Sequence, residues 1–468
     1  MTNTDRLSPL DASFLHLENE YASMHIGSTS IFEGPAPAFE EVRALVEAKL
    51  ADIPRYRQVV RFVPMDLGRP VWADDPHFNL DFHVRHTALP APGGAAELRR
   101  LVARVMSQQL DRSRPLWEMW ITEGLDDGRW ALVSKVHHAM VDGVSGAELL
   151  STVLDISPDA EPGVATEWEP RPAPSSVELA TEAVAQLVKS PYEQFRALRA
   201  AGRVPRQALN QLKEVGTGLS SLAGILSAPP ESSLNGPIGP HRRYVWTSVS
   251  VDDIKTVRAG LGGSFNDVVL ATITRGFRKL LRERGETTDR VVRTLVPVSV
   301  RPRVEGEVAS GDGTMENRVS AMFAELPVML EDPGEALAAV SAQMADLKES
   351  KQAVAGEALT SVAEFTPPML LALGERVAAR AAQRNVNTVT TNVPGPQLPL
   401  YSLGRRMEAV YPFVPLAGQI RLGVAMFSYD GTVYFGITGD FDTCADVEVL
   451  SDGIEAGMED LLHLARSA

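Results

Sequence analysis

The clearest structural signal lies in residues 130–150, which read WALVSKVHHAMVDGVSGAELL. Apolar and β-branched residues dominate the first part, Trp130 to Val136, and predict a mostly buried strand that ends at a pair of histidines. Successive side chains of a strand point to opposite faces, so we expect His137 and His138 to face different surroundings. One histidine can then react while the other supports it.

The residues after the histidines predict a turn and a helix. Asp142 and Gly143 indicate a tight turn, because glycine adopts positive φ without steric cost and aspartate can hydrogen-bond the nearby backbone. Ser145 and Glu148 fit a capping box that would begin the helix. The element therefore places an imidazole at a strand end, where a pKa of about 6.5 suits a general base near neutral pH. The alternative is a histidine pair that only forms hydrogen bonds in a core.

The composition argues against several classes of function. The chain has 468 residues, enough for two or three domains, and its 44% hydrophobic and 22% charged fractions are those of an ordinary globular protein. A formal net charge of -15 argues against a nucleic-acid partner, which would require a basic face. The single cysteine, Cys444, excludes an internal disulfide and a cysteine-rich metal site, and fits a reducing compartment.

The sequence gives no sign of a membrane-spanning segment. The first residues lack the basic and apolar regions of a secretion signal, and no uncharged apolar run approaches the roughly 20 residues that span a bilayer. We therefore expect a cytoplasmic protein whose contact with a membrane or a lipid droplet is at most peripheral. The nucleophile elbow, the phosphate-binding loops and the zinc-protease motif are also missing from the sequence.

The first half of the chain predicts short strands and amphipathic helices. Pro115-Leu116-Trp117 directly precedes one of the strands, and His25, which lies in another, is assigned a structural role. By apolar periodicity we expect strands at residues 24–32, 81–89 and 118–121, and helices at 39–53 and from about 98 to 110.

A linker and a basic helical segment follow. Residues 157–174 are rich in proline and acidic residues and predict a linker. Residues 177–227 have helical periodicity, with six basic and four acidic residues in a chain that is otherwise strongly acidic. Such a segment can lie on an anionic lipid surface or pack on the body of the protein as a crossover, and both interpretations stay open.

The second half begins with a strand and a short helix, and then a strong helix opens at Ser264. Ser264 and Asp267 form a second capping-box pattern, which places Asn266 in the first helical turn, where negative charge is stabilised. Pro297 predicts an edge position for its strand. We expect strands at residues 242–251, 294–301, 317–323 and 388–396, a hairpin at 422–438 with a turn at Asp430-Gly431, and helices at 254–261, 335–347 and 446–464.

These motifs resemble those of a known family. The string His137-His138-Ala139-Met140-Val141-Asp142-Gly143 matches HHxxxDG, the signature of the CoA-dependent acyltransferase superfamily. Together with the Ser-Pro-x-Asp opening, Pro-Leu-Trp, the NDVVLA segment and the TNVPGP turn, it resembles the bacterial wax ester synthase/diacylglycerol acyltransferases in content and order. The resemblance implies an α/β (α+β) fold of two chloramphenicol acetyltransferase-like domains, each a mixed sheet with flanking helices, and a tunnel between them. We place the domains at residues 1–156 and 241–468, with 157–240 as linker and crossover.

The resemblance also implies roles for individual residues. His138 would act as general base on an acceptor hydroxyl, which attacks the thioester of a long-chain acyl-CoA. The transfer would be direct, without an acyl-enzyme. Acyl-CoA would be a substrate, and the reaction would require no cofactor and no metal. Asn266 would stabilise the oxyanion. The remaining residues assigned to the site are His137 as a catalytic partner, Asp142, Gly143, Arg301 and Asp267 as structural residues, and Pro115, Leu116 and Trp117 as substrate-binding residues.

Three points stay open at the level of the sequence. The acceptor is diacylglycerol, a long-chain fatty alcohol or both, because a sequence does not reveal the width of a tunnel. A condensation-type enzyme or another HHxxxDG acyltransferase with a different acceptor is an alternative. So is a non-catalytic lipid-binding module that keeps the fold.

Overall fold

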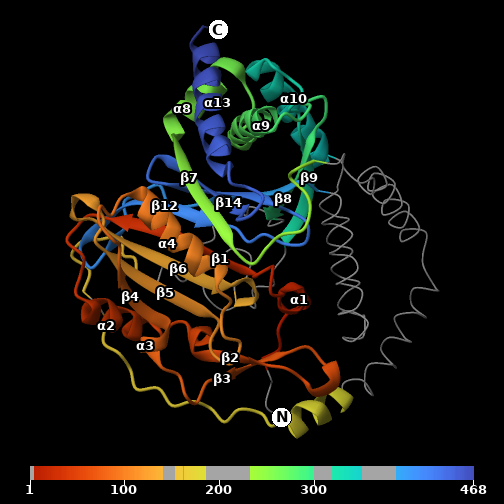
Figure 1. Cartoon of the computed structure of the whole chain (residues 1–468). Coiled ribbons are helices and arrows are strands. Elements are labelled where there is room, and N and C mark those ends of the chain that lie inside the picture. The colour runs from red at the N-terminus through yellow and green to blue at the C-terminus, as the bar shows by residue number, and fades with distance from the viewer. Residues whose placement is uncertain are drawn as a thin grey trace.

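The protein is organised around two six-stranded sheets (Figure 1). The structure is a computed structural model that describes residues 5–140, 153–161, 163–185, 232–299, 319–349 and 386–467. A third sheet is a small antiparallel hairpin of β2 (Gln58–Arg61) and β3 (Val71–Asp74). The two large sheets and their helices agree with the predicted mixed α/β class.

The first sheet brings β1 beside the histidine strand. β1 (His25–Phe32) and β6 (Trp130–His137) are antiparallel, with His25 opposite His137. Around them the order is β11 (Tyr401–Ser402), β12 (Arg405–Phe413), β1, β6, β5 (Trp117–Glu123) and β4 (Val84–Ala88). The helices of this part of the chain are α1 (Pro9–Leu17), α2 (Phe39–Lys49), α3 (Leu80–His83) and α4 (Ala95–Ser107).

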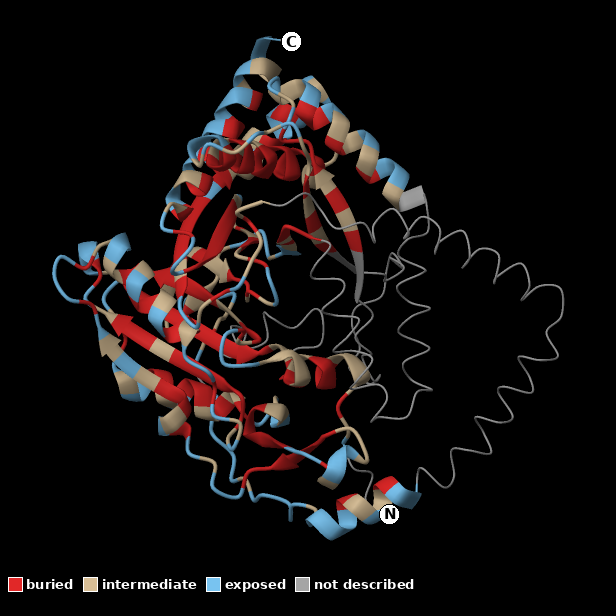
Figure 2. Ribbon diagram, turned by 45° about the vertical axis from the view of Figure 1, so that its right-hand side comes forward, coloured by how far each residue is buried: buried red, intermediate tan, exposed pale blue. Residues whose placement is uncertain are grey.

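The second sheet packs against a layer of helices, whose buried faces Figure 2 shows in red. The strand order is β7 (Arg242–Ser250), β14 (Thr432–Asp440), β13 (Leu422–Tyr429), β10 (Thr388–Pro394), β8 (Val292–Ser299) and β9 (Val319–Leu326). The helices are α8 (Val251–Leu261), α9 (Phe265–Glu283), α10 (Pro333–Glu349) and α13 (Val447–Ser467). The apolar stripe of α9 forms the centre of this core, as its periodicity predicted.

The two sheets are joined by a strand that sequence periodicity did not reveal. β12 lies late in the chain, yet it pairs with β1 of the first sheet. It also approaches β14 closely, because a Cβ atom at Gly436 would lie only 1.6 Å from the carbonyl oxygen of Pro412. The hydroxyl of Tyr244 on β7 donates to that same carbonyl at 2.8 Å. The predicted boundaries at residues 156 and 240 stay predictions, but residues of the 241–468 segment complete the first sheet.

Several local predictions are confirmed. β13 and β14 form the expected hairpin, with Asp430 and Gly431 at φ values of 43° and 80°, as a tight turn between antiparallel strands requires. The Ser264 side chain caps α9 by accepting from the backbone N–H of Asp267. Among the described residues, none of the helices combines the length and the apolar composition needed to cross a lipid bilayer.

Three local predictions are wrong. The segment 81–89 is a strand only from Val84, because Asn79 caps a helical turn, α3, over its first residues. α4 ends at Ser107 and not near residue 110. Pro297 lies in an internal strand: β8 pairs with β10 only at Thr294 and Leu295, so the proline lies beyond the end of that ladder, where its missing N–H costs no hydrogen bond.

A buried histidine lies in the core of the first sheet. His83 stacks on the Trp117 ring, with 4.7 Å between the centroids, and its Nδ1 donates to the Trp117 carbonyl at 2.8 Å. Phe78 also stacks on the His83 imidazole, with 5.3 Å between the ring centroids. Burial lowers the pKa of His83 to about 4, although the carbonyl of Trp117 acts in the opposite direction.

We predict that His83 makes the folded state sensitive to acid. As the pH falls from about 6.5 to about 4, the unfolded chain binds a proton at this side chain and the folded chain does not, so the free energy of unfolding falls. We expect His83→Gln to be less stable than the wild type at every pH. The slope of its unfolding free energy against pH should be smaller than that of the wild type by up to about 1.4 kcal/mol per pH unit. Urea unfolding between pH 7.5 and 4.5 measures the slope, with His77→Gln, an exposed histidine, as control. Equal slopes in the two variants would contradict this assignment.

Candidate functional site

The two histidines leave the strand in different environments. β6 ends at His137, and His138 opens a short 3-10 turn, η4 (His138–Met140). The backbone N–H of His137 donates to Leu116 at 2.9 Å, and that of His138 donates to Met24 at 2.8 Å. The backbone is thus held by both neighbouring strands, and the prediction that the two imidazoles face different surroundings is confirmed.

His137 is fully buried and points toward a carboxylate. Its Nδ1 accepts the backbone N–H of Ala139 at 3.0 Å, so its proton is on Nε2. That Nε2 lies 3.7 Å from Oε2 of Glu18. His137 therefore supports the chain geometry and has no exposed surface for a reactant.

Glu18 lies at the centre of a buried cluster in which Arg112, His25 and His137 all contact its carboxylate. Its side chain is 3% exposed, and its Oε2 accepts from Nε and Nη2 of Arg112 at 2.9 and 2.6 Å. Oε1 lies 3.1 Å from Nε2 of His25, on the strand beside His137. Burial opposes ionisation, but the imidazoles of His137 and His25 beside the carboxylate outweigh it and hold the pKa of Glu18 well below its usual value.

His25 completes the cluster, as its predicted structural role requires. Its Nε2 also lies 3.3 Å from the backbone nitrogen of Leu110, but the shorter contact is the one to the carboxylate. Burial lowers the pKa of His25 to about 4, although Glu18 acts in the opposite direction. Sequence reasoning missed Glu18, because an isolated acidic residue 119 positions before His137 carries no local pattern.

His138 is the half-buried member of the pair. Its ring stacks on Phe14 of α1, with 3.9 Å between the centroids and 21° between the planes. Its Nδ1 has no hydrogen-bond partner among the described residues. Burial lowers the pKa of His138 to about 4, so the imidazole is neutral at pH 7 and can accept a proton.

The opening Ser-Pro-x-Asp segment positions Phe14. Ser8 caps α1 by accepting the N–H of Asp11 at 3.1 Å and donates its hydroxyl to the Asp11 carboxylate at 2.6 Å. Pro9 occupies the first helical position, where its missing N–H costs nothing. The sequence thus contains the signal for the start of α1. It does not reveal that Phe14 of this helix stacks on His138.

Asn266 lies beside a second asparagine. The Asn392 side-chain amide on β10 donates to Oδ1 of Asn266 at 3.1 Å, which brings the NDVVLA and TNVPGP segments together. Among the described residues, the NH2 group of Asn266 donates to no partner. Asp267 has a structural role: its Oδ2 accepts the backbone N–H of Ser264 at 2.8 Å and closes the capping box.

The Pro-Leu-Trp triplet packs in the core. Pro115, Leu116 and Trp117 are buried, and the Trp117 indole N–H donates to the carbonyl of Tyr56 at 2.8 Å. Together with the bond from His137 to Leu116, these contacts give the triplet a packing role under the histidine strand. The predicted contact with substrate stays a prediction.

Three predicted site residues lie outside the described residues: Asp142, Gly143 and Arg301. The predicted tight turn at Asp142 and Gly143 and the structural role of Arg301 therefore stay predictions. Within the described ranges, no group of three or more histidine, cysteine, aspartate or glutamate side chains is arranged to hold a metal ion.

Sequence comparison matches nearly the whole chain to one family. The wax ester synthase/diacylglycerol acyltransferase catalytic domain matches residues 7–269, and the C-terminal domain of the same family matches residues 315–462. A probable diacylglycerol O-acyltransferase of Mycobacterium tuberculosis, tgs1, is 38% identical over 474 residues, covering 99% of this chain and 96% of that protein.

Solved structures show the same similarity. The wax ester synthase/diacylglycerol acyltransferase of Marinobacter aquaeolei VT8 superposes with a TM-score of 0.69 at 27% identity, covering 98% of this chain and 100% of that one. The starter condensation domain of rhizomide synthetase, at 14% identity and a TM-score of 0.58, covers 100% of this chain and 95% of that one. The latter likeness supports the predicted two-domain acyltransferase fold alone.

We predict that Glu18→Gln destabilises the protein and disturbs the histidine pair. The amide cannot balance Arg112 and the two imidazoles, and removal of one partner from a buried ionic cluster costs about 3–5 kcal/mol, less here because Arg112 is partly exposed. Thermal unfolding should show a lower midpoint, and Glu20→Gln, an exposed neighbour, should match the wild type. Identical midpoints for Glu18→Gln and Glu20→Gln would show that the cluster contributes nothing.

Proposed function

Because the chain belongs to the wax ester synthase/diacylglycerol acyltransferase family, we propose that it transfers a long-chain acyl group from acyl-CoA to the hydroxyl of diacylglycerol, of a long-chain fatty alcohol, or of both. The product is a triacylglycerol with the first acceptor and a wax ester with the second. The membership supports the coarser statement directly: the protein is an acyl-CoA-dependent O-acyltransferase of neutral lipid synthesis.

The observation that carries the proposal is the position of His138, whose imidazole directly follows the end of β6 and stacks on Phe14. An alcohol is a poor nucleophile until its proton has an acceptor, and a neutral imidazole at the end of a rigid strand is such an acceptor. Phe14 limits the orientation of the ring, and the low pKa keeps it neutral throughout the physiological range. An imidazolium at this position could not remove the proton.

The proposed reaction is a direct transfer. The hydroxyl oxygen attacks the thioester carbonyl carbon while His138 takes the hydroxyl proton, and the carbonyl becomes a tetrahedral oxyanion. The intermediate collapses by breaking the carbon-sulfur bond, and His138 returns the proton to the departing thiolate, which leaves as CoA. Cys444, the one thiol of the chain, is buried, and burial raises its pKa, so it is unsuited to form an acyl-enzyme.

Asn266 is our candidate for oxyanion stabilisation. Its oxygen is occupied by the bond from Asn392, which orients the NH2 group as a donor, and it lies in the first turn of α9, where the helix dipole favours negative charge. Both features suit the stabilisation of charge on the former carbonyl oxygen.

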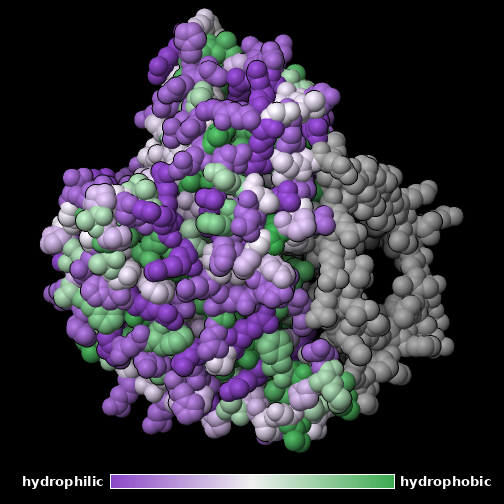
Figure 3. All heavy atoms as spheres, in the orientation of Figure 1, coloured by the Kyte–Doolittle hydropathy of each residue, from purple (hydrophilic) through white to green (hydrophobic). Residues whose placement is uncertain are grey.

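We also propose a peripheral lipid contact at the hairpin of β2 and β3. Phe62 and Met65 at its tip are exposed, Met65 by 79%, and so are Val177 and Val184 in the helical segment 176–185. The two segments pack together through Val63, Val71, Leu179 and Ala183. Figure 3 shows apolar groups at this end of a face that is otherwise mostly hydrophilic. Such an apolar surface suits the delivery of a water-insoluble acceptor.

We predict that His138→Gln lowers kcat by about 100 to 10,000-fold, the range for loss of a general base. Because the ring is half-buried at the start of a turn, the unfolding midpoint should change little. Acyl-CoA turnover with diacylglycerol measures the effect, with His77→Gln as the matched control. Unchanged turnover in folded His138→Gln would remove His138 from the mechanism and favour the non-catalytic, lipid-binding alternative.

The acceptor is tested by competition. Diacylglycerol and hexadecanol compete for labelled palmitoyl-CoA, and the lipid products are separated. We expect labelled triacylglycerol, labelled wax ester or both, and no transfer to an amine acceptor. Formation of an amide product alone would identify a condensation-type enzyme and overturn the proposal.

A further inference from the structure

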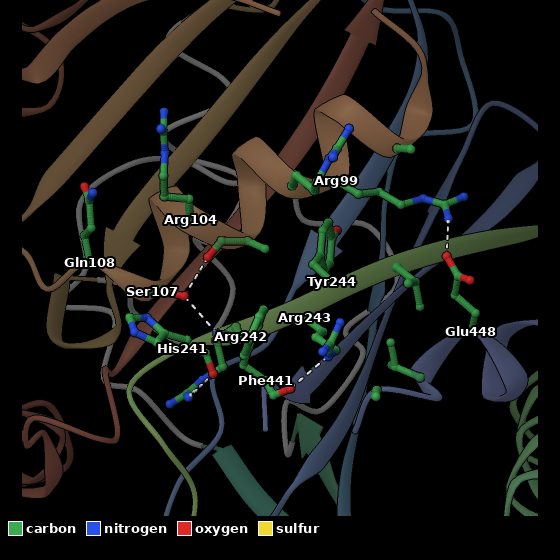
Figure 4. A pocket seen from close by; sticks show the side chains of 16 residues that line it. Arg99, Arg104, Ser107, Gln108, His241, Arg242, Arg243, Tyr244, Phe441 and Glu448 are labelled. Carbon is green, nitrogen blue, oxygen red and sulfur yellow. Dashed lines mark hydrogen bonds and ion pairs between the residues drawn. The ribbon is translucent and has the colours of Figure 1, made fainter. Parts of the chain in front are cut away.

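An open cavity of about 680 Å³ lies where the two halves of the molecule meet (Figure 4). One wall is the exposed side of α4, and the other is formed by the start of β7 and the segment that leads into α13. The volume is within the range of small-molecule sites in proteins. None of its lining residues belongs to the histidine cluster or to the asparagine pair described above.

The lining of the cavity is basic, although the chain as a whole is acidic. Five arginines line it, while the chain as a whole carries a formal charge of -15. Glu448 is the one acidic residue among the described lining residues. The lining arginines are Arg99, Arg100 and Arg104 from α4, and Arg242 and Arg243 from β7.

Most of this positive charge is not neutralised within the described part of the chain. Arg100 pairs with Glu97 of its own helix, and Arg99 reaches Glu448 only at 3.5 Å. Arg104 is exposed, and no carboxylate lies within 4.0 Å of it among the described residues. A cluster of guanidinium groups without counter-charges attracts anions to the cavity.

Arg242 adds a buried charge to the floor. Its side chain is 5% exposed and donates to the backbone carbonyls of Gly239, His241 and Tyr21. Burial lowers the pKa of Arg242, although Asp440 acts in the opposite direction, and within the described ranges no carboxylate forms an ion pair with the guanidinium. The neighbouring Arg99 has a buried Nε without a hydrogen-bond partner in the same part of the structure. A bound anion would supply the counter-charge that Arg242 lacks.

The cavity also has an apolar and aromatic side. The guanidinium of Arg243 lies over the Phe441 ring at 4.3 Å, and its Nε donates to the Phe441 carbonyl at 2.8 Å. Among the described residues, its Nη atoms donate to no partner. Ala445 and Val447 continue this surface toward α13. An inorganic anion alone would leave the apolar side of the cavity without a partner. The lining therefore favours a ligand that carries both an anionic group and an apolar organic group.

We propose that this arginine cavity is a binding site for an organic phosphate ester. The planar fork of arginine matches phosphate oxygens in a bidentate manner, and several arginines around one cavity suit a ligand with more than one phosphoryl group. The source is a soluble phosphate ester, including the nucleotide of a CoA thioester, or the headgroup of an acidic phospholipid. The inference does not depend on the proposed acyl transfer. Because the walls come from both halves of the molecule, the ligand also stabilises their junction.

The first experiment measures binding of soluble phosphates by titration calorimetry. The probes are adenosine 3′,5′-bisphosphate, glycerol 3-phosphate and inorganic phosphate, with adenosine as the uncharged control. The variant is Arg104→Gln combined with Arg243→Gln. The control double variant is Arg282→Gln combined with Arg466→Gln, which also removes two positive charges, but from exposed positions outside the cavity. We expect the cavity double variant to bind the bisphosphate at least tenfold more weakly than the control double variant, and both to keep a cooperative unfolding transition in the absence of ligand.

A second experiment separates the sources. Vesicles of phosphatidylcholine with or without phosphatidylglycerol are sedimented with each variant, and the KM for palmitoyl-CoA is measured in parallel. Loss of bisphosphate binding with a raised KM identifies the nucleotide of the acyl donor, loss of bisphosphate binding alone identifies a separate soluble ligand, and loss of phosphatidylglycerol binding identifies the lipid headgroup. If the cavity double variant and the control double variant bind every phosphate probe and both vesicles equally, the proposal is overturned.

Discussion

The carboxylate of Glu18 is the group on which the geometry of the site depends. It is buried, and a buried charge persists only if other groups in the protein satisfy it. Arg112, His25 and His137 do so from three segments, namely the loop after α4 and two adjacent strands. Their requirement for the same carboxylate fixes the end of β6, and the chain then turns so that the next residue, His138, leaves the core. The imidazole that we propose as general base is therefore positioned by its fully buried neighbour, His137.

The junction of the two sheets is a second constraint. β12 pairs with β1 in one sheet and packs closely against β14 of the other, where Gly436 admits the Pro412 carbonyl. The stacking of Trp246 on Tyr411, at 4.6 Å, adds a contact between β7 and β12. The halves are thus held together by backbone proximity and by aromatic packing. The arginine cavity, which is lined by α4 and β7, exists only because this junction is fixed.

Sequence reasoning succeeded where the signal was local. The buried strand of Trp130–Val136, the capping box of Ser264 and the Asp430-Gly431 turn each depend on residues within a few positions of one another, and the structure has all three. Glu18 and β12 were missed because their partners are far away in the chain. A lone carboxylate has no periodicity, and the pairing of a strand with β1 some 380 residues earlier depends on the complete fold. The arginine cavity was missed for the same reason, since its cations come from two separate segments.

The position of β12 also has a consequence for biosynthesis. During translation, β1 leaves the ribosome early and acquires β6 as one neighbour, but its other edge has no partner until residue 413 has been made. Until then the first sheet presents an open hydrogen-bonding edge, through which nascent chains can associate wrongly. The first sheet reaches its final form only after residues 405–413 have been made, so its folding order cannot follow the order of its residues.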